Sequence, residues 1–386
     1  MRAECSILDS LLSSLGFMHV ARQGALRFAV EALLAGRRLI LTALGRTARG
    51  DGAAKHSIKR IDRLLGNRIL HSETAGVFSR IADFVIGSRP RPIILIDWTP
   101  LGRGSLFHAL VASVPSEGRA LILYTEVVPL RLVANAAVER RFVSKLLDVL
   151  PARCRPIFVT DAGFRTPWFD LLRGHGVDFV GRLRHRSLVQ LPSGAWMPAK
   201  TLHSQATKTA KDLGLHMLTR SRPRPTRLVL VRKSRKHRTR RTARGLVGNS
   251  VADWRGQACA REPWLLVTSL TEPAERVVAI YATRMQIEET FRDLKNHRFG
   301  WSLEDARCTT PARWRTLLLL AACAAVVVML VGRAAENAGL QRDLIANTSK
   351  RRVFSCFTLG LEVLAGARAT QLDWRRAWSQ LTHAVE

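Results

Sequence analysis

Apolar positions recur with helical spacing along the first part of the chain, to about residue 88. The segments LGFMHVARQGALRFAVEALLAG and LILTALGRTA have this spacing, which predicts amphipathic helices. The basic segment KHSIKRIDRLLGNR follows directly after a Gly-rich stretch. That order predicts a helix–turn–helix-like arrangement, with an ordinary basic surface helix as the alternative. The stretch GSRPRP then predicts a linker.

Short apolar runs replace the helical pattern after this linker. RPIILIDWTP, SLFHALVASVP and RALILYTEVVP predict three strands, and a helix is expected near residues 136–150. RPIFVTDAGF, PWFDLLRGHG and VDFVGRLR predict a further strand, a helix and a strand. This order is typical of a mixed α/β sheet. Asp97 and Asp161 are expected at the ends of two of these strands, where side chains emerge at the edge of a sheet.

A strongly basic segment begins after about residue 186. TRSRPRPTRLVLVRKSRKHRTRRTARG contains twelve Lys and Arg between residues 220 and 244 and no acid. We expect a flexible basic loop between short strands, which contacts phosphates without reading sequence. Regular structure resumes at EPWLLVTSL, so residues 186–270 are predicted to form an insertion.

The stretch YATRMQIEETFRDLK, residues 281–295, contains no Gly or Pro and predicts one uninterrupted helix. On a helical wheel, four polar side chains form a narrow stripe beside the apolar face. They are Tyr281, Arg284, Glu288 and Lys295. Glu289 falls about 100° away from Glu288 on the wheel and is expected to be a solvated surface acid.

The longest apolar run, residues 317–332, is short for a membrane span of roughly 20 residues and predicts a buried core helix. The N-terminus has no secretory signal pattern, and the six cysteines have neither metal-ligand spacing nor a disulfide framework. We therefore expect a cytoplasmic protein without a zinc site.

Charge narrows the choice of partner. The chain has 61 Lys+Arg against 30 Asp+Glu, a net charge of +31. Such a surface repels itself unless a polyanion neutralises it. DNA or RNA is the first candidate partner, and an anionic membrane surface is the second.

Three acids lie within or beside apolar segments, where a carboxylate is costly unless it is paired, hydrogen-bonded or bound to a cation. They are Asp97 in IILIDWT, Asp161 in IFVTDAGF and Glu288 beside the apolar face of its helix. Together they could hold two divalent cations, and oxygen ligands suit Mg²⁺ or Mn²⁺. Two such ions stabilise the attacking and leaving oxygens at a phosphodiester. This set predicts a nucleic-acid phosphoryl-transfer enzyme.

The acids and the polar stripe occur in a recognisable order along the chain. Asp97 and Asp161 precede Tyr281-x-x-Arg284-x-x-x-Glu288-x-x-x-x-x-x-Lys295. KHSIKRIDRLLGNR, IDWT, VTDAGF-x-x-PWF, EPWLLVTSL and RMQIEETFRDLK stand around them. This pattern resembles the DDE transposases of bacterial insertion sequences, in particular the branch with the Y-R-E-K signature, which cuts and pastes through a hairpin on the element end.

The resemblance implies an RNase H-like catalytic core, interrupted by a β-strand insertion before the final helix. It also implies roles for individual residues. Asp97, Asp161 and Glu288 would be catalytic ligands of two Mg²⁺ or Mn²⁺ ions. Tyr281, Arg284 and Lys295 would hold phosphates of the strand that is not transferred. Trp264 would stack on a base flipped out during hairpin formation, with a buried strand-end tryptophan as the alternative.

The resulting hypothesis is a cut-and-paste transposase. Hydrolysis frees a 3′-hydroxyl at the element end, this hydroxyl attacks the opposite strand to form a hairpin, and the reopened 3′ ends join target DNA. The expected partners are the terminal inverted repeats, target DNA and a second protomer on paired ends, with no membrane and no small-molecule substrate. The expected location is the bacterial cytoplasm, on the nucleoid. An RNase H-like nuclease and a catalytically inactive DNA-binding copy are the alternatives.

These expectations divide the chain into five segments. Residues 1–88 would form a helical N-terminal DNA-binding domain, and residues 89–185 the first part of the core. Residues 186–270 would form a β-rich basic insertion, and residues 271–332 the second part of the core with the Glu288 helix. Residues 333–386 would form a C-terminal helical region with dimer contacts.

Overall fold

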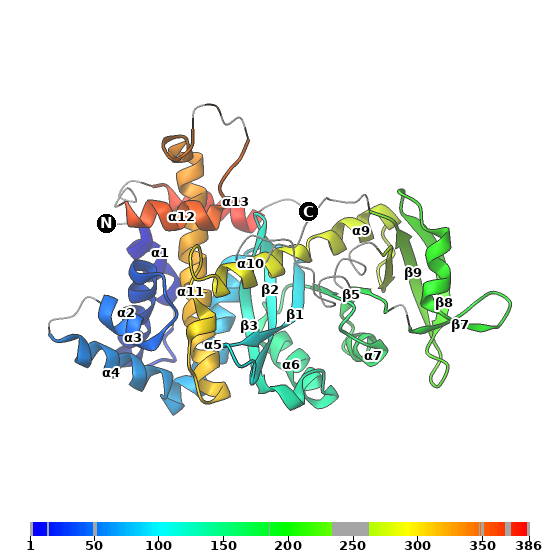
Figure 1. The fold of residues 1–386 in the computed structure, drawn as a ribbon, viewed down its shortest axis with the longest axis horizontal. Helices are drawn as coiled ribbons and strands as arrows, with labels where there is room; N and C mark the ends of the chain where they lie inside the picture. The colour runs from blue at the N-terminus through cyan, green and yellow to red at the C-terminus, as the bar shows by residue number, and fades with distance from the viewer. Residues whose placement is uncertain are drawn as a thin grey trace. The chain divides into compact units, whose positions relative to one another are not determined.

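The chain divides into two compact units in the computed structural model (Figure 1). The first unit comprises Met1–Pro156 and Thr283–Glu386, and the second comprises Ile157–Ala282. The division falls inside the segment 89–185 that the sequence analysis assigned to one part of the core. The structure describes residues 3–13, 15–48, 52–184, 186–233, 262–346, 348, 351–366 and 372–383.

The N-terminal part of the first unit is helical, as predicted. Its helices are α1 (Ala3–Leu12), α2 (Val20–Gly36), α3 (Leu41–Thr47), α4 (Ala54–Leu65) and α5 (Arg68–Ile86). The side chain of Asn67 caps α5 by accepting a hydrogen bond from the Leu70 amide at 2.8 Å. Helices α3 and α4 cross closely, because a Cβ on Gly45 would lie 2.5 Å from the Cα of Ile58. The sequence pattern therefore produces a tightly packed helix pair with a basic second helix.

An antiparallel sheet follows in the first unit. It contains β1 (Ile93–Leu101), β2 (Phe107–Ser116) and β3 (Arg119–Pro129), in the order β3-β2-β1. Asp97 pairs with Val111 in the middle of β1, so the prediction that this strand ends at Asp97 is wrong. The strand continues because Thr99 and Leu101 are buried and extend the pairing with β2.

Five further α-helices of the first unit lie among the described residues. They are α6 (Ala136–Val149), α10 (Met285–Lys295), α11 (Pro311–Asn337), α12 (Cys356–Ala365) and α13 (Trp374–His383). Helix α11 contacts α2, α5, α12, α13 and β3. Among the described residues, α11 alone is long and apolar enough to cross a membrane, and 94% of its apolar window is buried. The prediction that residues 317–332 form a buried core helix is confirmed.

Helices α11 and α12 approach each other at two glycines. A Cβ on Gly332 would lie 1.8 Å from the carbonyl oxygen of Cys356. A Cβ on Gly360 would lie 2.0 Å from the carbonyl oxygen of Val328. The backbones touch at this crossing, and any side chain would separate them.

The second unit contains a mixed sheet. Its strands have the order β4-β5-β10-β9-β8-β6-β7, with β4 and β5 parallel and the pairs from β5 through β10 and β9 to β8 antiparallel. The strands are β4 (Ile157–Thr160), β5 (Asp178–Arg182), β6 (Leu188–Gln190), β7 (Trp196–Pro198), β8 (Lys211–Leu218), β9 (Arg224–Val231) and β10 (Trp264–Thr268). Its α-helices are α7 (Thr166–Gly174) and α9 (Ala274–Ala282).

Part of the predicted basic loop is a strand. Residues 224–231 form β9, which pairs with β8 and β10, so the loop prediction is wrong for them. The apolar side chains of RLVLV account for this strand, because Leu228 to Val231 are buried. Residues 234–244 of the predicted loop lie outside the described residues.

Short 3₁₀ turns complete the fold: η1 (Leu130–Leu132), η2 (Ala199–Gln205), η3 (Leu303–Asp305) and η4 (Leu340–Leu344).

Candidate active site

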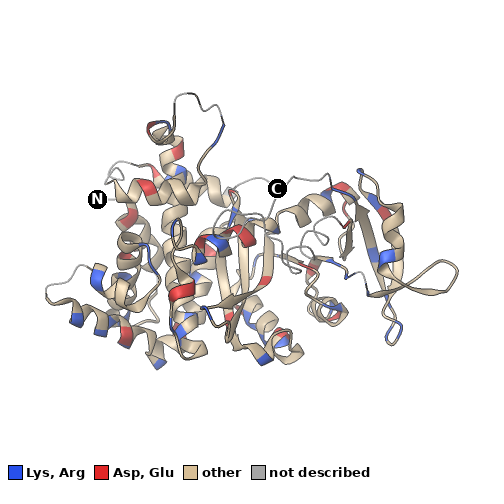
Figure 2. Ribbon diagram, viewed as in Figure 1, with Lys and Arg blue, Asp and Glu red and all other residues tan. Residues whose placement is uncertain are grey.

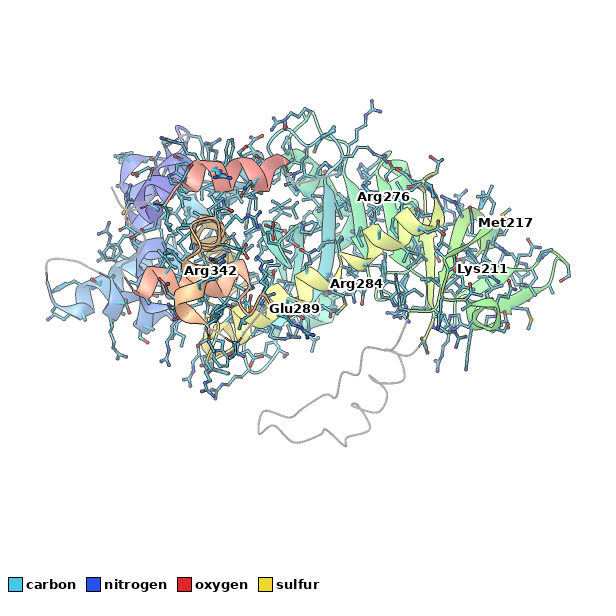
Figure 3. All side chains as sticks on the ribbon, turned by 90° about the horizontal axis from the view of Figure 1, so that it is seen from above. Lys211, Met217, Arg276, Arg284, Glu289 and Arg342 are labelled. Atoms are coloured by element: carbon cyan, nitrogen blue, oxygen red, sulfur yellow. The ribbon has the colours of Figure 1, made fainter. Side chains whose placement is uncertain are left out.

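The helix predicted over residues 281–295 is interrupted. Helix α9 ends at Ala282 and α10 begins at Met285, with a turn at Thr283 and Arg284 (Figure 3). The amide of Gln286 donates to the Thr283 carbonyl at 2.9 Å, and that of Ile287 donates to the Arg284 carbonyl at 3.2 Å. These contacts span three residues rather than four, so the backbone tightens into a 3₁₀-like turn. The prediction of a continuous helix is therefore wrong, although no Gly or Pro marks the break.

Arg284 contacts both acids that the first unit contributes to the candidate site. Its Nη2 lies 2.7 Å from Glu288 Oε1, and its Nη1 lies 3.7 Å from Asp97 Oδ2. The Arg284 side chain is largely buried, with 13% of its surface exposed. One guanidinium thus joins a carboxylate in the middle of β1 to a carboxylate in the first turn of α10. The structure brings Asp97, Arg284 and Glu288 together, whereas the phosphate contact expected of Arg284 stays a prediction.

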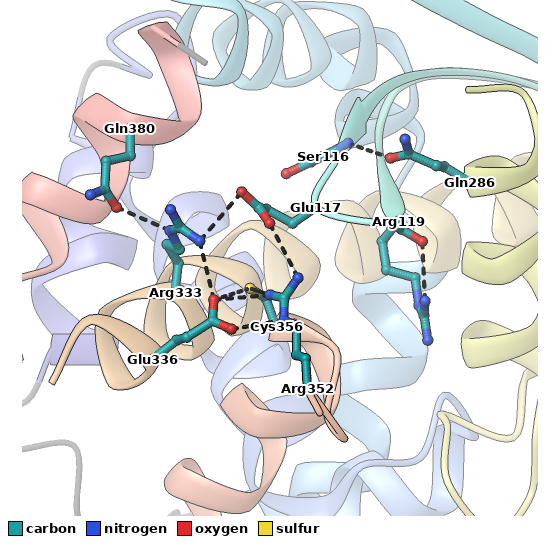
Figure 4. Close-up of polar contacts among 10 residues, drawn as sticks. Ser116, Glu117, Arg119, Gln286, Arg333, Glu336, Arg352, Cys356 and Gln380 are labelled. Carbon is teal, nitrogen blue, oxygen red and sulfur yellow. Dashed lines mark hydrogen bonds and ion pairs between the residues drawn. The ribbon is translucent and has the colours of Figure 1, made fainter. Parts of the chain in front are cut away.

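Three polar side chains attach helix α10 to the end of β2 and the start of β3. Thr290 exchanges two hydrogen bonds with the backbone of Ala120. Gln286 accepts one from the Ser116 amide at 3.0 Å (Figure 4), and Asp293 forms an ion pair with Arg119. These three residues follow the i, i+4, i+7 spacing of one helix face. The contacts fix the position of α10, and with it Glu288, against the sheet.

This polar face was not predicted from the sequence. Its only sequence signal is the recurrence of Gln286, Thr290 and Asp293 at helical spacing next to the apolar residues Ile287 and Leu294. Their partners lie about 170 positions earlier in the chain, where no local pattern points to them.

Lys295 adds positive charge near Asp97, and its charge also acts on His108. Burial lowers the pKa of the Lys295 ammonium, while the charges of Glu304 and Asp97 act in the opposite direction. Burial also lowers the pKa of His108, on β2, and the nearby Lys295 charge lowers it further. His108 is thereby favoured in its neutral form beside the lysine. Nothing in the sequence around His108 singles it out.

Asp161 belongs to the second unit and follows β4 directly, as predicted. Its Oδ1 accepts a hydrogen bond from the Gly163 amide at 2.6 Å. A Cβ on Gly163 would lie 2.7 Å from that oxygen, so glycine is needed for this tight turn. Arg184 holds the same loop by donating to the carbonyls of Ala162 and Gly163.

Trp264 and Tyr281 pack against each other in the second unit. Their ring centroids are 4.9 Å apart in an edge-to-face arrangement, and Tyr281 is 3% exposed. Tyr281 is thus buried rather than at the rim of its helix. Trp264, the first residue of β10, is half-buried, and the Lys233 ammonium lies 5.7 Å from the centroid of its ring. Phosphate contact by Tyr281 and base stacking by Trp264 stay predictions.

Glu289 differs from the prediction that it is a solvated surface acid. Glu289 forms an ion pair with Arg292 at 2.5 Å and is 22% exposed, less than Glu288 at 40%. It is therefore a paired acid and not a freely solvated one. Among the described residues of each unit, no group of three or more His, Cys, Asp or Glu side chains is close enough to hold a metal ion.

The chain matches a known protein family and is similar to a solved structure. A family model described as "Transposase DDE domain" matches residues 88–327, a range that contains Asp97, Asp161 and Glu288. A cryo-EM structure of the piggyBac transposase synaptic complex with hairpin DNA is similar over 98% of this chain and 76% of that chain, at 12% identity and a TM-score of 0.41. No curated protein sequence matches this chain.

Proposed function

Because the chain belongs to the family of transposase DDE domains, we propose that it is a cut-and-paste DNA transposase of a bacterial insertion sequence with an RNase H-like core. The observation that carries the proposal is the contact of Asp97 and Glu288 with one guanidinium inside the range that the family model matches. The Y-R-E-K arrangement of Tyr281, Arg284, Glu288 and Lys295 supports the hairpin-forming branch.

The residues present fit a divalent cation. Asp97 and Glu288 supply oxygen donors only, and both already lie against a positive charge. Hard cations such as Mg²⁺ or Mn²⁺ prefer such ligands. Asp97 and Glu288, joined by Asp161, would hold two ions, which would neutralise charge developing on the attacking and leaving oxygens. Convergence of Asp161 with the other two acids is part of the proposal.

The chain's own residues would bind and orient the DNA. Arg284 would exchange one of its carboxylate contacts for a phosphate, and Lys295 would hold a neighbouring phosphate as a cation. Tyr281 would contribute only its hydroxyl, because its ring is buried. Trp264 would stack on an unpaired base.

The N-terminal helices supply a second DNA contact. Lys and Arg gather along α4 (Figure 2), and Lys55, Lys59, Arg60 and Arg63 are exposed there. The close packing of α4 on α3 at Gly45 resembles the arrangement that presents one helix to DNA. Residues 1–88 would therefore bind the terminal inverted repeats.

The proposed reaction is a sequence of phosphoryl transfers. Water attacks a phosphorus at the element end, and the bond to the 3′ oxygen breaks to leave a 3′-hydroxyl. That hydroxyl attacks the opposite strand, which forms a hairpin and releases the flanking DNA. A second hydrolysis opens the hairpin, and each 3′-hydroxyl then joins target DNA. Two ends require two sites, so a homodimer on paired ends is expected, acting on the nucleoid in the cytoplasm.

A single experiment tests this proposal. Purified protein is incubated with a DNA fragment carrying the flanks of its own gene and Mg²⁺, and denaturing gels are examined for hairpins and joined products. Hairpins that disappear with Asp97→Asn support the proposal. Cleavage without hairpins or joining would indicate a nuclease with the same core. Specific DNA binding without any cleavage would indicate an inactive copy.

A further inference from the structure

Phe299 projects into solvent just beyond the helix that carries Glu288. It is 66% exposed, although the neighbouring Trp301 is fully buried. The guanidinium of Arg298 lies 5.0 Å from the centroid of its ring. An exposed aromatic ring beside an arginine is the pairing that proteins use to hold unstacked bases next to a phosphate backbone.

The turn that carries Phe299 is held rigidly. The side chain of Asn296, the residue after α10, holds the turn by accepting hydrogen bonds from the amides of Arg298 and Phe299, at 2.8 and 2.7 Å. The amide of Trp301 donates to the Asp293 carbonyl at 2.9 Å. A Cβ on Gly300 would lie 1.8 Å from that carbonyl oxygen, so glycine is required for the chain to turn back here.

A second set of contacts fixes the outer side of the turn. His297 Nδ1 lies 2.8 Å from Asp305 Oδ2, and Asp305 also accepts a hydrogen bond from Arg103 at 2.6 Å. The turn is thus tied to the β1–β2 connection and to η3. A single exposed apolar side chain on a surface needs no explanation, but a phenyl ring presented on a rigid turn loses little conformational entropy when a ligand stacks on it.

We propose that Phe299 is a stacking platform for an unpaired DNA base, with Arg298 contacting the adjoining phosphate. The inference rests on the proposed function, because it takes DNA as the ligand of the first unit. Charge favours this occupant over an apolar protein surface, since the side chain next to the ring is a cation and the chain carries a net charge of +31. Trp264, the other proposed stacking residue, belongs to the second unit.

The test uses the full chain and two probes of one mixed sequence: a short single-stranded oligonucleotide with one 2-aminopurine, and the same strand in a fully paired duplex. Base stacking of this kind predicts that Phe299→Ala and Phe299→Leu weaken single-strand binding about 5- to 150-fold. Duplex binding should change little, and Phe299→Trp should retain both affinities. Wild-type binding should quench 2-aminopurine, and the Ala and Leu variants should not. Val353→Ala is the matched control, because Val353 is an exposed apolar residue of the same unit.

Several results would overturn the inference. Unchanged single-strand binding in Phe299→Ala would do so, as would an equal loss on both probes or full retention by Phe299→Leu. A change in self-association of Phe299→Ala without DNA, measured by sedimentation, would identify a second copy as the occupant instead. Cleavage of the genomic fragment by the wild type is scored separately. If Phe299 governs single-strand binding while that cleavage is absent, the proposed function fails and the platform stands.

Discussion

Thr290 and Ala120 are joined by two hydrogen bonds, although 170 positions separate them along the chain. The Thr290 hydroxyl donates to the Ala120 carbonyl at 3.0 Å and accepts from the Ala120 amide at 2.7 Å. Both residues are buried. Since β3 is the edge strand of the sheet in the first unit, one side chain here takes the place of a neighbouring strand. The position of the Glu288 helix therefore depends on a threonine whose side chain bonds to backbone atoms and not to either acid.

Removing this hydroxyl should destabilise the protein. Thr290→Val keeps the shape of the side chain but leaves the Ala120 amide and carbonyl buried without this partner. Each buried group that loses its partner costs about 1–3 kcal/mol of the free energy of unfolding. Denaturant unfolding measures the loss. Thr290→Ser, which retains the hydroxyl, should recover most of the free energy of unfolding and the rate of Mg²⁺-dependent cleavage. Equal behaviour of the Val and Ser variants would show that the hydrogen bonds do not position α10.

Neutral replacements of the three acids should separate binding from chemistry. Asp97→Asn, Asp161→Asn and Glu288→Gln each remove one charged carboxylate of the proposed ligand set while keeping the size of the side chain. Because loss of a residue that only supports a metal ligand already costs about 10- to 100-fold, we expect each to lower cleavage by more than about 100-fold. End binding, measured by gel shift, should change little. Near wild-type cleavage in any variant would remove that residue from the ligand set, and Glu289→Gln is the control.

Phosphate contact by Arg284 and Lys295 should be visible in the salt dependence of DNA binding. Each lost contact is expected to reduce the slope of log K against log salt by about 0.9. Arg284→Ala and Lys295→Ala should show this reduction. Arg292→Ala provides the comparison, because Arg292 lies on the same helix, is exposed and pairs with Glu289. An unchanged slope in the first two variants would place their charges away from the DNA.

His108 should make the protein less stable in acid. Its pKa is lowered by burial and by the charge of Lys295, so the unfolded chain binds a proton at a higher pH than the folded chain does. Stability is unaffected above the ordinary histidine pKa of 6.5 and falls as pH drops below it, toward the lowered folded value. His108→Gln should therefore show a smaller decrease in Tm between neutral and mildly acid buffer than the wild type. His175→Gln, at an exposed position, should follow the wild type.

Trp264 allows packing and base stacking to be distinguished. Trp264→Ala removes both the contact with Tyr281 and the platform for a base. We expect a loss of hairpin yield, by about 5- to 150-fold if one stacked base is lost, with initial strand cleavage retained. Trp264→Phe keeps a ring and should retain part of the yield. A loss of Tm in Trp264→Ala with a normal hairpin yield would assign the residue to packing alone.

Local pattern predicted most elements of the fold, because helical periodicity and short apolar runs reflect burial directly. The helices before residue 88 and the buried helix around residues 317–332 follow from this. The end of β1 could not be predicted from local pattern, because the extension of this strand past Asp97 depends on its pairing with β2. The loop prediction also failed at β9, whose apolar residues stand among arginines that dominated the composition of the segment.

The candidate site likewise has contacts that local sequence predicts and contacts that only the folded chain shows. Arg284 and Glu288 are four residues apart and meet as neighbours on a helix do. Tyr281 does not belong to the same face, since the helical wheel assumed a continuous helix and the turn at Thr283 interrupts it. The contact of Arg284 with Asp97 and the hydrogen bonds of Thr290 join distant segments, so only the folded chain displays them.

The contact between α11 and α12 has a consequence for how variants of this chain are judged. Here a single methyl group at residue 332 or 360 would push apart two backbones in the centre of the protein. A variant with alanine there could keep Asp97, Asp161 and Glu288 unchanged and still fail to fold, so the presence of these three acids does not by itself indicate an intact protein.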